Sequence, residues 1–489
     1  MKKLLFSLQI LLFSSALLTI SKAGNTVLYA LTPKGGAYND GAIISFTPAT
    51  GAESVLWSFG SGTDGAGPTG SLTYNANNGL FYGTTQVGGT YNQGGTLFTF
   101  DPVTNLEHKV WNFGNGSDGA GPGADLTYDA GNGLYYGQTI TGGTVAGVIF
   151  SFNPTNNSEA VIYDFDGSIS GDGSTDFYYD ASQGILIAPG TGGQYFDGDL
   201  FSIDPSTQTI SDLWDFGNGT DGSGLWGFGS VAYDASNGLF YINTSRGGAN
   251  NKGAIISFNL STLTENVVYS FTGGTDANYV NESLAYDASN GLFYGTSFSG
   301  GANNLGTIFS FNPTTNAESV VHSFAGGADG ANPFGGIPVY DAANGLFYIM
   351  TNIGGTNNTG TIVSFNPTNN AENVVWSFGT GTDGNSPQGS FAQLPSPTGI
   401  STIATNALSV AVYPNPAQDH LTIQLKNSEV GDNYEFRIID ITGRELANNN
   451  YTVNNDTQTI DISSLTPGIY FLVLSNQQGR LTTQKFIKE

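Results

Sequence analysis

The sequence has no cysteine, few histidines and few basic residues. With zero cysteines and three histidines in 489 residues, a disulfide framework and a thiolate zinc site are excluded, and a histidine-based metal site has few ligands to draw on. Lys and Arg number 13 against 39 Asp and Glu, which gives a formal net charge of −26. Nucleic acids and anionic membranes bind surfaces rich in Lys and Arg. We therefore expect neither of them as a partner.

Glycine and aromatic residues are abundant by contrast. The chain has 70 glycines, and Phe, Trp and Tyr together make up 12% of it. Glycine thus has about twice its usual share, whereas a disordered low-complexity chain would have few aromatic residues. This composition predicts an all-β protein with glycine-rich turns and an aromatic core. The acidic residues are concentrated between positions 24 and 400, where 30 of the 39 lie.

The N-terminus has the composition of a signal peptide. Two lysines precede an apolar run from Leu4 to Ile20, and Ser21 and Ala23 place small residues at the positions that signal peptidase recognises. The run is short for a membrane span and is interrupted by three serines and a glutamine. We expect residues 1–23 to be removed during export.

A repeated unit fills the middle of the chain. A Gly-Leu-Phe-Tyr phrase or a variant of it places a copy at positions 80, 134, 185, 239, 292 and 346, and an earlier copy begins at position 28. Each copy contains four short β-rich segments, for example 282–288, 291–297, 306–313 and 318–324. The first two segments are joined by an Asn-Gly turn and the last two by an Asn-Pro-Thr-like turn, both typical of short antiparallel connections.

Seven copies of a four-stranded unit predict a seven-bladed β-propeller over residues 24–395. The first copy starts at its second segment (27–31), and the chain supplies the missing first segment only at 390–394. A closed ring would complete one blade by pairing these two ends, which is called Velcro closure. The alternative is an open solenoid, which would need capping repeats at both ends.

The connectivity of such a unit places tight turns on one face and long loops on the other. We call the segment between the second and third strands the middle loop, and the segment that leads to the next copy the connecting loop. Both kinds of loop share one face, where function is expected on a rigid scaffold. Aromatic and basic residues that break the repeat gather in these loops: Lys34, Tyr38, Tyr91, Tyr195, Phe196, Trp226, Phe228, Arg246, Lys252, Tyr279 and Phe334.

These residues predict a ligand-binding site. Exposed aromatic faces stack on sugar rings and other flat surfaces, and nearby polar groups set the orientation of the ligand. We expect the site to lie around four residues on neighbouring blades, with two more tyrosines as further contacts: Tyr195, Trp226, Arg246 and Lys252, then Tyr38 and Tyr91. The alternative is that the rings pack back against their own loops.

One aspartate recurs in every connecting loop. The seven residues are Asp64, Asp118, Asp172, Asp221, Asp276, Asp329 and Asp383. A ring of carboxylates predicts a Ca²⁺ site completed by backbone carbonyls and water, but each residue could equally cap its own glycine turn. No other cofactor is expected, because the G-x-G-x-x-G pattern at 60–65 is followed by a strand and not by the helix that a dinucleotide needs.

Other recurring polar residues have a structural interpretation. A glutamate recurs beside the tight turn between the third and fourth segments, where we expect it to be solvated, at positions 53, 107, 159, 265, 318 and 372. His322 takes the place of the Trp found in four other copies, so we expect it to pack. No Ser-His-Asp set can be assembled. No catalytic residue is assigned, and the sequence favours a non-catalytic protein.

The repeat ends after Leu394. Residues 396–407 form a predicted linker rich in Ser, Thr and Pro. Residues 408–489 contain about seven short strands with alternating apolar residues, which predicts a small antiparallel β-sandwich.

Two family resemblances rest on these segments. The stretches Gly-Gly-Ala-Asn-Asn-Leu-Gly-Thr-Ile-Phe-Ser-Phe-Asn-Pro (300–313) and Ala-Asp-Gly-Ala-Asn-Pro (328–333) resemble the GloVer-type tandem repeats of bacterial surface proteins. This resemblance implies an exported, repeat-built protein, and the family has no established activity. The motifs Val-Tyr-Pro-Asn-Pro-Ala (412–417), Asp-Ile-Thr-Gly-Arg (440–444) and Lys-Phe-Ile-Lys (485–488) resemble the C-terminal sorting domain of type IX secretion. That resemblance implies two partners, an outer-membrane translocon and a sortase-like peptidase that removes the domain.

The sequence thus predicts an extracellular or outer-membrane-attached protein, with no membrane span after signal cleavage. We expect a binding module, with carbohydrate as the candidate ligand. Two alternatives stay open. The first is a polysaccharide hydrolase or lyase that uses carboxylates on the long-loop face, and the second is a structural or adhesive surface protein.

Overall fold

The structure is a computed structural model. It describes residues 26–61, 63–91, 94–165, 175–218, 221–225, 231–280, 282–394, 409–426, 433–440, 445–452, 457–476 and 479–489. The predicted signal peptide and the predicted linker lie outside these residues. The chain divides into two compact units, Met1–Pro395 and Ser396–Glu489, and each is described by itself.

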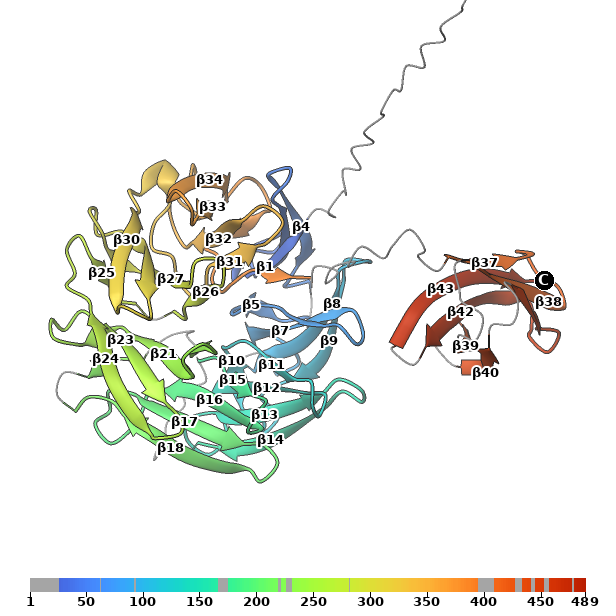
Figure 1. The fold of residues 1–489 in the computed structure, drawn as a ribbon, viewed down its shortest axis with the longest axis horizontal. Helices are drawn as coiled ribbons and strands as arrows, with labels where there is room; N and C mark the ends of the chain where they lie inside the picture. Colours follow the sequence, from blue (N-terminus) through green and yellow to red (C-terminus); the bar gives the residue numbers. More distant parts are fainter. Residues whose placement is uncertain are drawn as a thin grey trace, which may run out of the picture. The chain divides into compact units, whose positions relative to one another are not determined.

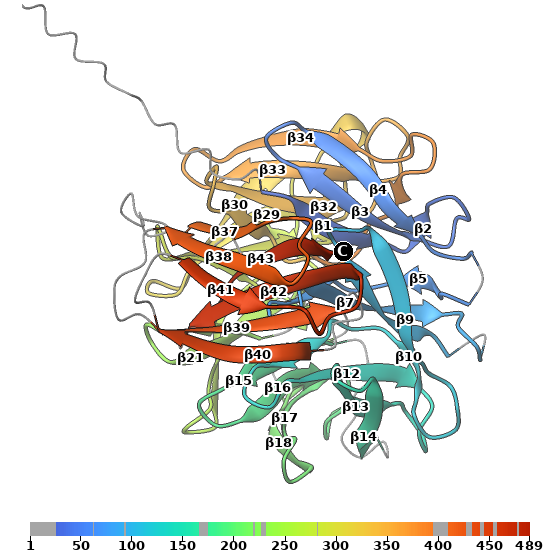
Figure 2. The ribbon, with the colours of Figure 1, turned by 90° about the vertical axis from the view of Figure 1, so that its right-hand side faces the viewer.

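The prediction of an all-β protein is confirmed. Within the described residues, the strands are joined by turns, and the single helical element is the 3₁₀ turn η1 (Gly327–Asp329). The first unit contains seven antiparallel sheets in which four strands follow one another in the same order. Figure 1 shows these sheets arranged around a common centre, and Figure 2 shows them from the side.

Each sheet is built outward from the centre of the unit. The seven innermost strands are β36 (Ala392–Gln393), β6 (Thr73–Asn75), β11 (Thr127–Asp129), β15 (Tyr178–Asp180), β20 (Ala232–Asp234), β26 (Ala285–Asp287) and β31 (Val339–Asp341). The second strands are β1 (Leu28–Thr32), β7 (Leu80–Val87), β12 (Leu134–Thr141), β16 (Ile185–Gly190), β21 (Leu239–Thr244), β27 (Leu292–Ser297) and β32 (Leu346–Thr351). In this order they belong to sheets 1 to 7.

The third and fourth strands follow in the same order. The third strands are β3 (Ala42–Thr47), β8 (Thr96–Asp101), β13 (Val148–Asn153), β17 (Asp199–Asp204), β23 (Ala254–Asn259), β29 (Thr307–Asn312) and β33 (Thr361–Asn366). The outer strands are β4 (Ala52–Ser58), β9 (Leu106–Asn112), β14 (Ser158–Asp164), β18 (Thr209–Asp215), β24 (Thr264–Ser270), β30 (Ala317–Ser323) and β34 (Ala371–Ser377). The second and third strands are largely buried, and apolar residues occupy both faces of the third strands.

Short strands in five of the connecting loops join one sheet to the next. In sheets 2 and 3 these are β5 (Ala66–Pro68) and β10 (Ala120–Pro122), which pair with the ends of β7 and β12. Elsewhere they form two-stranded ladders: β19 (Gly222–Ser223) with β22 (Arg246–Gly247), β25 (Ala277–Asn278) with β28 (Ser299–Gly300), and β35 (Gly384–Asn385) with β2 (Lys34–Gly35). The last ladder joins the end of the repeat region to its beginning.

The predicted turn chemistry is present in the hairpins. In sheet 6, the Asp287 carboxylate accepts a hydrogen bond from the Ser289 amide, and Gly291 closes the turn at a φ of 72°. The Asn290 side chain donates to the Tyr294 hydroxyl at 3.0 Å, so the turn is fixed from both sides. Gly suits the end of this turn because it accepts a left-handed backbone conformation at low cost, and Asn290 contributes through its side-chain hydrogen bonds.

Every outer strand carries one irregularity at the same place. The register between the third and outer strands shifts at Ile43/Ile44 in sheet 1 and at the equivalent pair of each other sheet. Such a bulge adds one residue and increases the local twist. In each copy it comes just before the recurring Trp, Tyr or His, so the bulge sets the direction of that side chain.

Seven apolar clusters fill the spaces between neighbouring sheets. One cluster lies between sheets 1 and 2, and five more follow between successive sheets up to sheet 7. The seventh joins sheet 7 to sheet 1, where Met350 and Phe378 pack with Leu28, Ile44 and Phe391. In this sheet 1, β36 from the end of the repeat region pairs with β1 from its beginning.

The second unit consists of two antiparallel sheets around one core. The strands are β37 (Ser409–Tyr413), β38 (His420–Lys426) and β41 (Thr457–Asp461) in one sheet, and β40 (Glu445–Thr452), β39 (Asn433–Asp440), β42 (Gly468–Asn476) and β43 (Gly479–Lys488) in the other. Leu421 and Ile460 from the first sheet pack with Phe436, Leu472 and Phe486 from the second.

Candidate functional site

Four aromatic side chains are exposed on the middle loops of sheets 1, 2 and 4. Tyr38, Tyr91 and Tyr195 occupy the same position in their loops and are 55%, 44% and 41% exposed. Phe196 follows Tyr195 with a φ of 58° and is 82% exposed. In sheet 3 the same position is held by Val145, which is also exposed. The predicted aromatic surfaces therefore face the solvent in sheets 1, 2 and 4.

Sheets 5, 6 and 7 have a different residue at this loop position. Asn250, Asn303 and Asn357 turn back, and their amides donate to the backbone oxygens of the phenylalanine 21 residues further on, at 3.1, 3.1 and 3.2 Å. The same loop position thus carries an exposed aromatic ring in three copies and a hydrogen-bonded amide in three others.

The predicted ligand site between sheets 4 and 5 lies partly within the described residues. Tyr195 lies against Gly217 at the start of the connecting loop 216–225. Arg246 lies on β22 opposite Ser223, which belongs to the end of the same loop. The Lys252 side chain lies over Gly273 in the next connecting loop. Trp226, Phe228 and Asp172 lie outside the described residues.

The loop aromatics of sheet 6 pack against one another. The rings of Tyr279 and Phe298 have centroids 5.9 Å apart, and those of Phe298 and Phe334 lie 5.7 Å apart. Tyr279 and Phe334 therefore follow the alternative prediction, in which the aromatic rings pack back against loops.

Five of the seven connecting-loop aspartates accept hydrogen bonds from their own loops. The Gly379 amide donates to Asp383 at 2.9 Å, the Thr272 amide to Asp276 at 2.7 Å, and the Ala325 amide to Asp329 at 2.6 Å. Asp64 and Asp221 accept from Gly60 and Gly217 in the same way. Capping accounts for these bonds, and calcium binding by these aspartates stays a prediction.

The expectation that the recurring glutamates are solvated is wrong. Glu107 is only 8% exposed, and each glutamate lies beside the loop aspartate of the preceding sheet: Glu53 with Asp383, Glu107 with Asp64, Glu159 with Asp118, Glu265 with Asp221, Glu318 with Asp276, and Glu372 with Asp329. Sequence reasoning missed these pairs because the two partners come from different copies. Sheet 4 has Ile210 at the equivalent position.

The neighbouring carboxylates change the acidity of these glutamates. Burial, followed by the charge of the paired aspartate, raises the pKa of Glu53, Glu159 and Glu265 to about 7 and that of Glu107, Glu318 and Glu372 to about 8. One carboxylate oxygen of each of the six is buried without a hydrogen-bond partner. These groups therefore hold protons near neutral pH.

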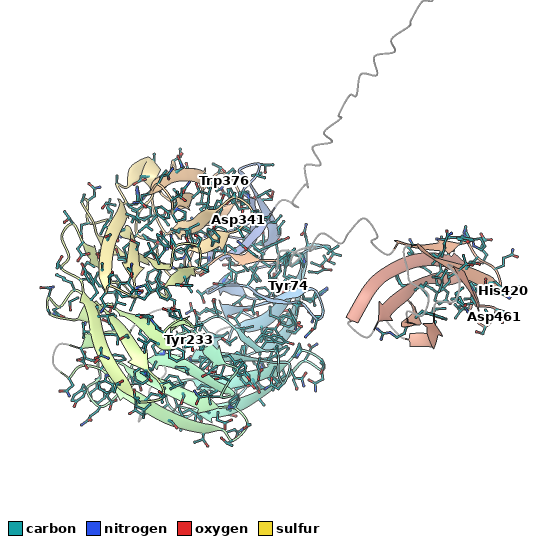
Figure 3. All side chains as sticks on the ribbon, in the orientation of Figure 1. Tyr74, Tyr233, Asp341, Trp376, His420 and Asp461 are labelled. Carbon is teal, nitrogen blue, oxygen red and sulfur yellow. The ribbon has the colours of Figure 1, made fainter. Side chains whose placement is uncertain are left out.

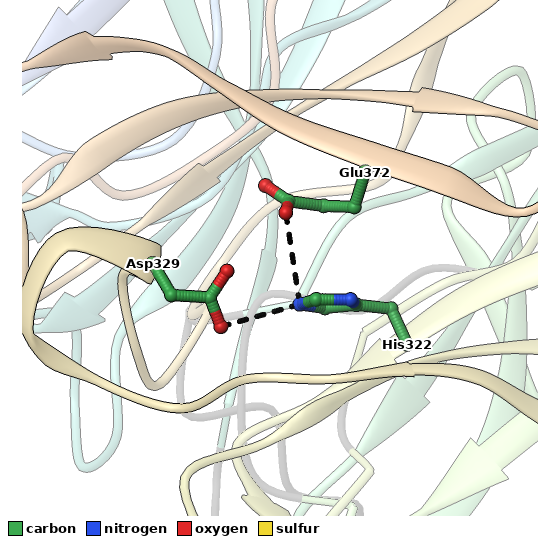
Figure 4. Close-up of side chains that lie close together, drawn as sticks. All are labelled: His322, Asp329 and Glu372. Atoms are coloured by element: carbon green, nitrogen blue, oxygen red, sulfur yellow. Dashed lines mark hydrogen bonds and ion pairs between the residues drawn. The ribbon is translucent and has the colours of Figure 1, made fainter.

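One of these pairs includes a histidine. His322 Nε2 lies 3.3 Å from Asp329 Oδ2 and 3.9 Å from Glu372 Oε2 (Figure 4). Its ring also contacts Phe324 edge to face at 5.0 Å, as a packing residue would. Among the described residues, these three form the one group of His, Asp and Glu side chains whose ligand atoms all lie within 4.8 Å of one another.

Three more acidic side chains lie near the inner ends of the sheets. The Asp125 amide donates to Asp176 Oδ1 at 2.7 Å, the Ser71 amide donates to Asp125, and the Gly335 amide donates to Glu282 Oε1 at 2.7 Å. Glu282 is 2% exposed, and its Oε2 has no hydrogen-bond partner. Burial and the charge of Asp125 raise the pKa of both Asp176 and Glu282, the latter to about 7.

The tight-turn face has a pocket that the sequence did not predict. It lies between sheets 4 and 5 and has a volume of about 580 Å³. Its lining includes Tyr178, Tyr179, Tyr233 and Leu260, and Tyr233 is labelled in Figure 3. Two departures from the repeat could have indicated it: Tyr178 replaces the small residue of most other copies, and Leu260 replaces the recurring turn proline.

The fold and its repeated loop sites define an all-β repeat protein with a propeller-like architecture. The chain belongs to the Gloeobacter/Verrucomicrobia repeat family, which matches residues 13–188 and 185–400. Residues 411–489 match the secretion system C-terminal sorting domain. This domain marks the chain for type IX secretion to the cell surface or the extracellular space.

Solved structures share the fold at low identity. A candidate 6-phosphogluconolactonase from Bacteroides fragilis is 12% identical with a TM-score of 0.50, over 77% of this chain and 99% of its own. The GH74 xyloglucanase from Xanthomonas campestris is 12% identical with a TM-score of 0.50, over 82% of this chain and 56% of its own. The comparison with curated proteins found no match. In the described residues, no helix has the length and apolarity to cross a membrane.

Proposed function

We propose that this exported protein binds polysaccharide through the exposed aromatic residues of its middle loops. The observation that carries the proposal is the division of one loop position between exposed Tyr38, Tyr91 and Tyr195 and the bonded asparagines of sheets 5 to 7. Sugar rings stack on such surfaces, and several weak contacts at fixed spacing suit a polymer. Trp226, Arg246 and Lys252 are proposed to extend this surface toward sheet 5.

The scaffold for this surface is proposed to be a closed seven-bladed propeller. Each of the seven sheets would be one blade, and the pairing of β36 with β1 would be its Velcro closure. Two features of the junction between sheets 7 and 1 support closure: its apolar cluster and the pair formed by Glu53 and Asp383. Other neighbouring sheets are joined by the same kinds of cluster and pair. A closed ring holds the loop aromatics at fixed positions.

Replacing the three tyrosines should remove most of the binding. We expect the Y38A/Y91A/Y195A variant to bind its polysaccharide at least tenfold more weakly, since a stacked aromatic ring contributes about 0.5–1.5 kcal/mol beyond its area. A glycan array identifies the polymer, and affinity electrophoresis or calorimetry measures the change.

The N250A/N303A/N357A variant is the matched control. It changes the same loop position in sheets 5 to 7 and should leave the affinity within about twofold, which corresponds to about 0.4 kcal/mol. Equal affinity of the tyrosine variant and the wild type would reject these loops as the site. Loss of binding in Y233A alone would instead move the site to the pocket between sheets 4 and 5.

Deleting residues 408–489 should keep the protein inside the cell envelope. The sorting domain is the part of the chain that the type IX machinery recognises, so the shortened protein should accumulate in the periplasm of its natural host. Fractionation and immunoblotting of cells and medium measure this. Appending residues 408–489 to an exported fluorescent protein should send that protein outward. C-terminal peptides on the mature surface protein would contradict removal by a sortase-like peptidase.

The inner acidic residues favour a second candidate function. Asp125, Asp176 and Glu282 combine buried carboxyl groups of raised pKa, and a hydrolase or lyase needs a carboxyl group that is protonated at neutral pH. Incubating the protein with the polysaccharide that it binds and looking for shorter products tests this. Products that persist in D176N would exclude these residues from catalysis.

A further inference from the structure

We propose that His322, Asp329 and Glu372 bind one divalent transition-metal ion of the zinc type. The site lies between two sheets: His322 is near the end of β30 in sheet 6, Asp329 follows in the connecting loop, and Glu372 is near the start of β34 in sheet 7. One imidazole nitrogen and two carboxylate oxygens form a donor set that Zn²⁺ accepts. It differs from a calcium site, which takes six or more oxygens.

The distances fit such an ion with little movement. Bonds of about 2.0–2.1 Å in a tetrahedral site place neighbouring ligand atoms about 3.3 Å apart. His322 Nε2 is 3.3 Å from Asp329 Oδ2 and 3.9 Å from Glu372 Oε2, and the three ligand atoms lie within 4.8 Å of one another. The His322 and Asp329 side chains are 21% and 22% exposed, so water can complete the coordination.

The Glu372 carboxylate has an unsatisfied oxygen, as the other five recurring glutamates do. The Glu372 side chain is 9% exposed, it points toward the imidazole (Figure 4), and its Oε1 is buried without a hydrogen-bond partner. A buried carboxylate oxygen without a partner is unfavourable. A cation bound by both carboxylate oxygens of Glu372 would satisfy Oε1 as well as Oε2.

The other copies have a different residue at the position of His322. This explains why, among the described residues, the group of one histidine and two carboxylates occurs at one junction between sheets. The position of His322 is held by Trp57, Trp111, Trp214 and Trp376 in sheets 1, 2, 4 and 7, and by tyrosine in sheets 3 and 5. In sheet 5 the Tyr269 hydroxyl donates to Asp276 at 3.2 Å. Indole and phenol offer a donor to the aspartate, whereas a neutral imidazole offers a lone pair to a metal. The Asp–Glu pair recurs between other neighbouring sheets. At this junction the histidine adds the third ligand of the proposed metal site.

The repeat allows two opposite tests, in which one substitution removes the proposed metal site and another creates a second one. The full chain without a polyhistidine tag is titrated with Zn²⁺ alone by calorimetry and with Co²⁺ alone by visible absorption. We expect one equivalent for the wild type, none for H322W, and two for W376H, because Trp376 stands next to the pair Asp383 and Glu53. The H420A variant removes another of the three histidines and should still bind one equivalent.

Thermal unfolding gives a second measurement. Zn²⁺ should raise the unfolding temperature of the wild type and leave that of H322W unchanged, because an ion that binds only the folded state stabilises it. Equal concentrations of Ca²⁺ should not substitute. No bound Zn²⁺ in the wild type, or one equivalent retained by H322W, would overturn the proposal. One equivalent in W376H would overturn its geometric basis.

Discussion

A chain that ends at residue 385 should lose most of its stability, whereas a chain that ends at residue 395 should unfold like the intact N-terminal unit. The shorter chain lacks β36, which supplies the innermost strand of sheet 1. It also lacks Phe391, which is 5% exposed within the cluster between sheets 7 and 1. Removing a buried Phe side chain alone costs about 3–5 kcal/mol.

Several hydrogen bonds are lost with this strand. The Ser390 amide donates to Ser71 Oγ, the Ile337 amide donates to Ser390 Oγ, and the Gln393 side chain donates to the Tyr340 carbonyl, at 2.8, 2.8 and 3.2 Å. Each contributes about 1 kcal/mol. The total approaches the whole stability of a typical domain, about 5–15 kcal/mol.

Circular dichroism during heating and urea titration measure the difference between the two chains. The control that ends at 395 also lacks the sorting domain, so the comparison isolates residues 386–395. Equal unfolding midpoints for both chains would show that β36 does not close the ring, and would favour the open solenoid.

The first unit should be less stable at pH 8.5 than at pH 5.5, contrary to the usual behaviour of carboxylates that are paired with cations. Burial and the charge of Asp64 raise the pKa of Glu107 from 4.5 to about 8, and the nearby Lys109 only partly opposes this. The folded state therefore keeps a proton that the unfolded state releases above its own pKa. This contribution to stability is complete below about pH 4.5 and is lost as the pH rises through about 8. Glu53, Glu159 and Glu265 act in the same direction.

The E107Q variant separates this effect from the rest of the chain. Glutamine keeps the shape and cannot ionise, so we expect E107Q to match the wild type near pH 5 and to exceed it at pH 8.5. The gain should be about 1–2 kcal/mol, since one pKa unit corresponds to about 1.4 kcal/mol and solvent screening reduces the full shift.

Urea unfolding at four pH values between 5 and 8.5 measures this gain. E489Q, which changes the exposed C-terminal residue, should follow the wild type at every pH. An E107Q variant less stable than the wild type at pH 8.5 would show that Glu107 is ionised and stabilising in the folded protein.

The sequence predicted the repeated architecture because its signals are local. These signals are the Asn-Gly and Asn-Pro turns, the alternation of apolar residues and the displaced first segment at 390–394. Each of them can be recognised within one copy or at the ends of the repeat region. Seven occurrences of the same phrase make the strand order readable without long-range information. The exposure of Tyr38, Tyr91 and Tyr195 was also predictable, because loop position and the break in the repeat are both visible in the sequence.

The acidic pairs could not be predicted in this way. Glu107 and Asp64 are 43 residues apart and belong to different sheets, so their contact depends on how one sheet is tilted against the next. The sequence placed Glu107 beside a turn, where glutamate is usually solvated. The surroundings of His322 could not be predicted for the same reason. Its alignment with tryptophan predicted packing, and only the structure places Glu372 beside it.

The middle loops separate ligand contacts from folding. Their exposed rings lie outside the seven apolar clusters, so a residue at this position can change without disturbing the core. For the proposed polymer binding, seven equivalent loop positions on one frame would give a variable valency, because each copy can add or withdraw one contact. Evolution could thus tune avidity for a long chain one loop at a time, while the scaffold remains the same.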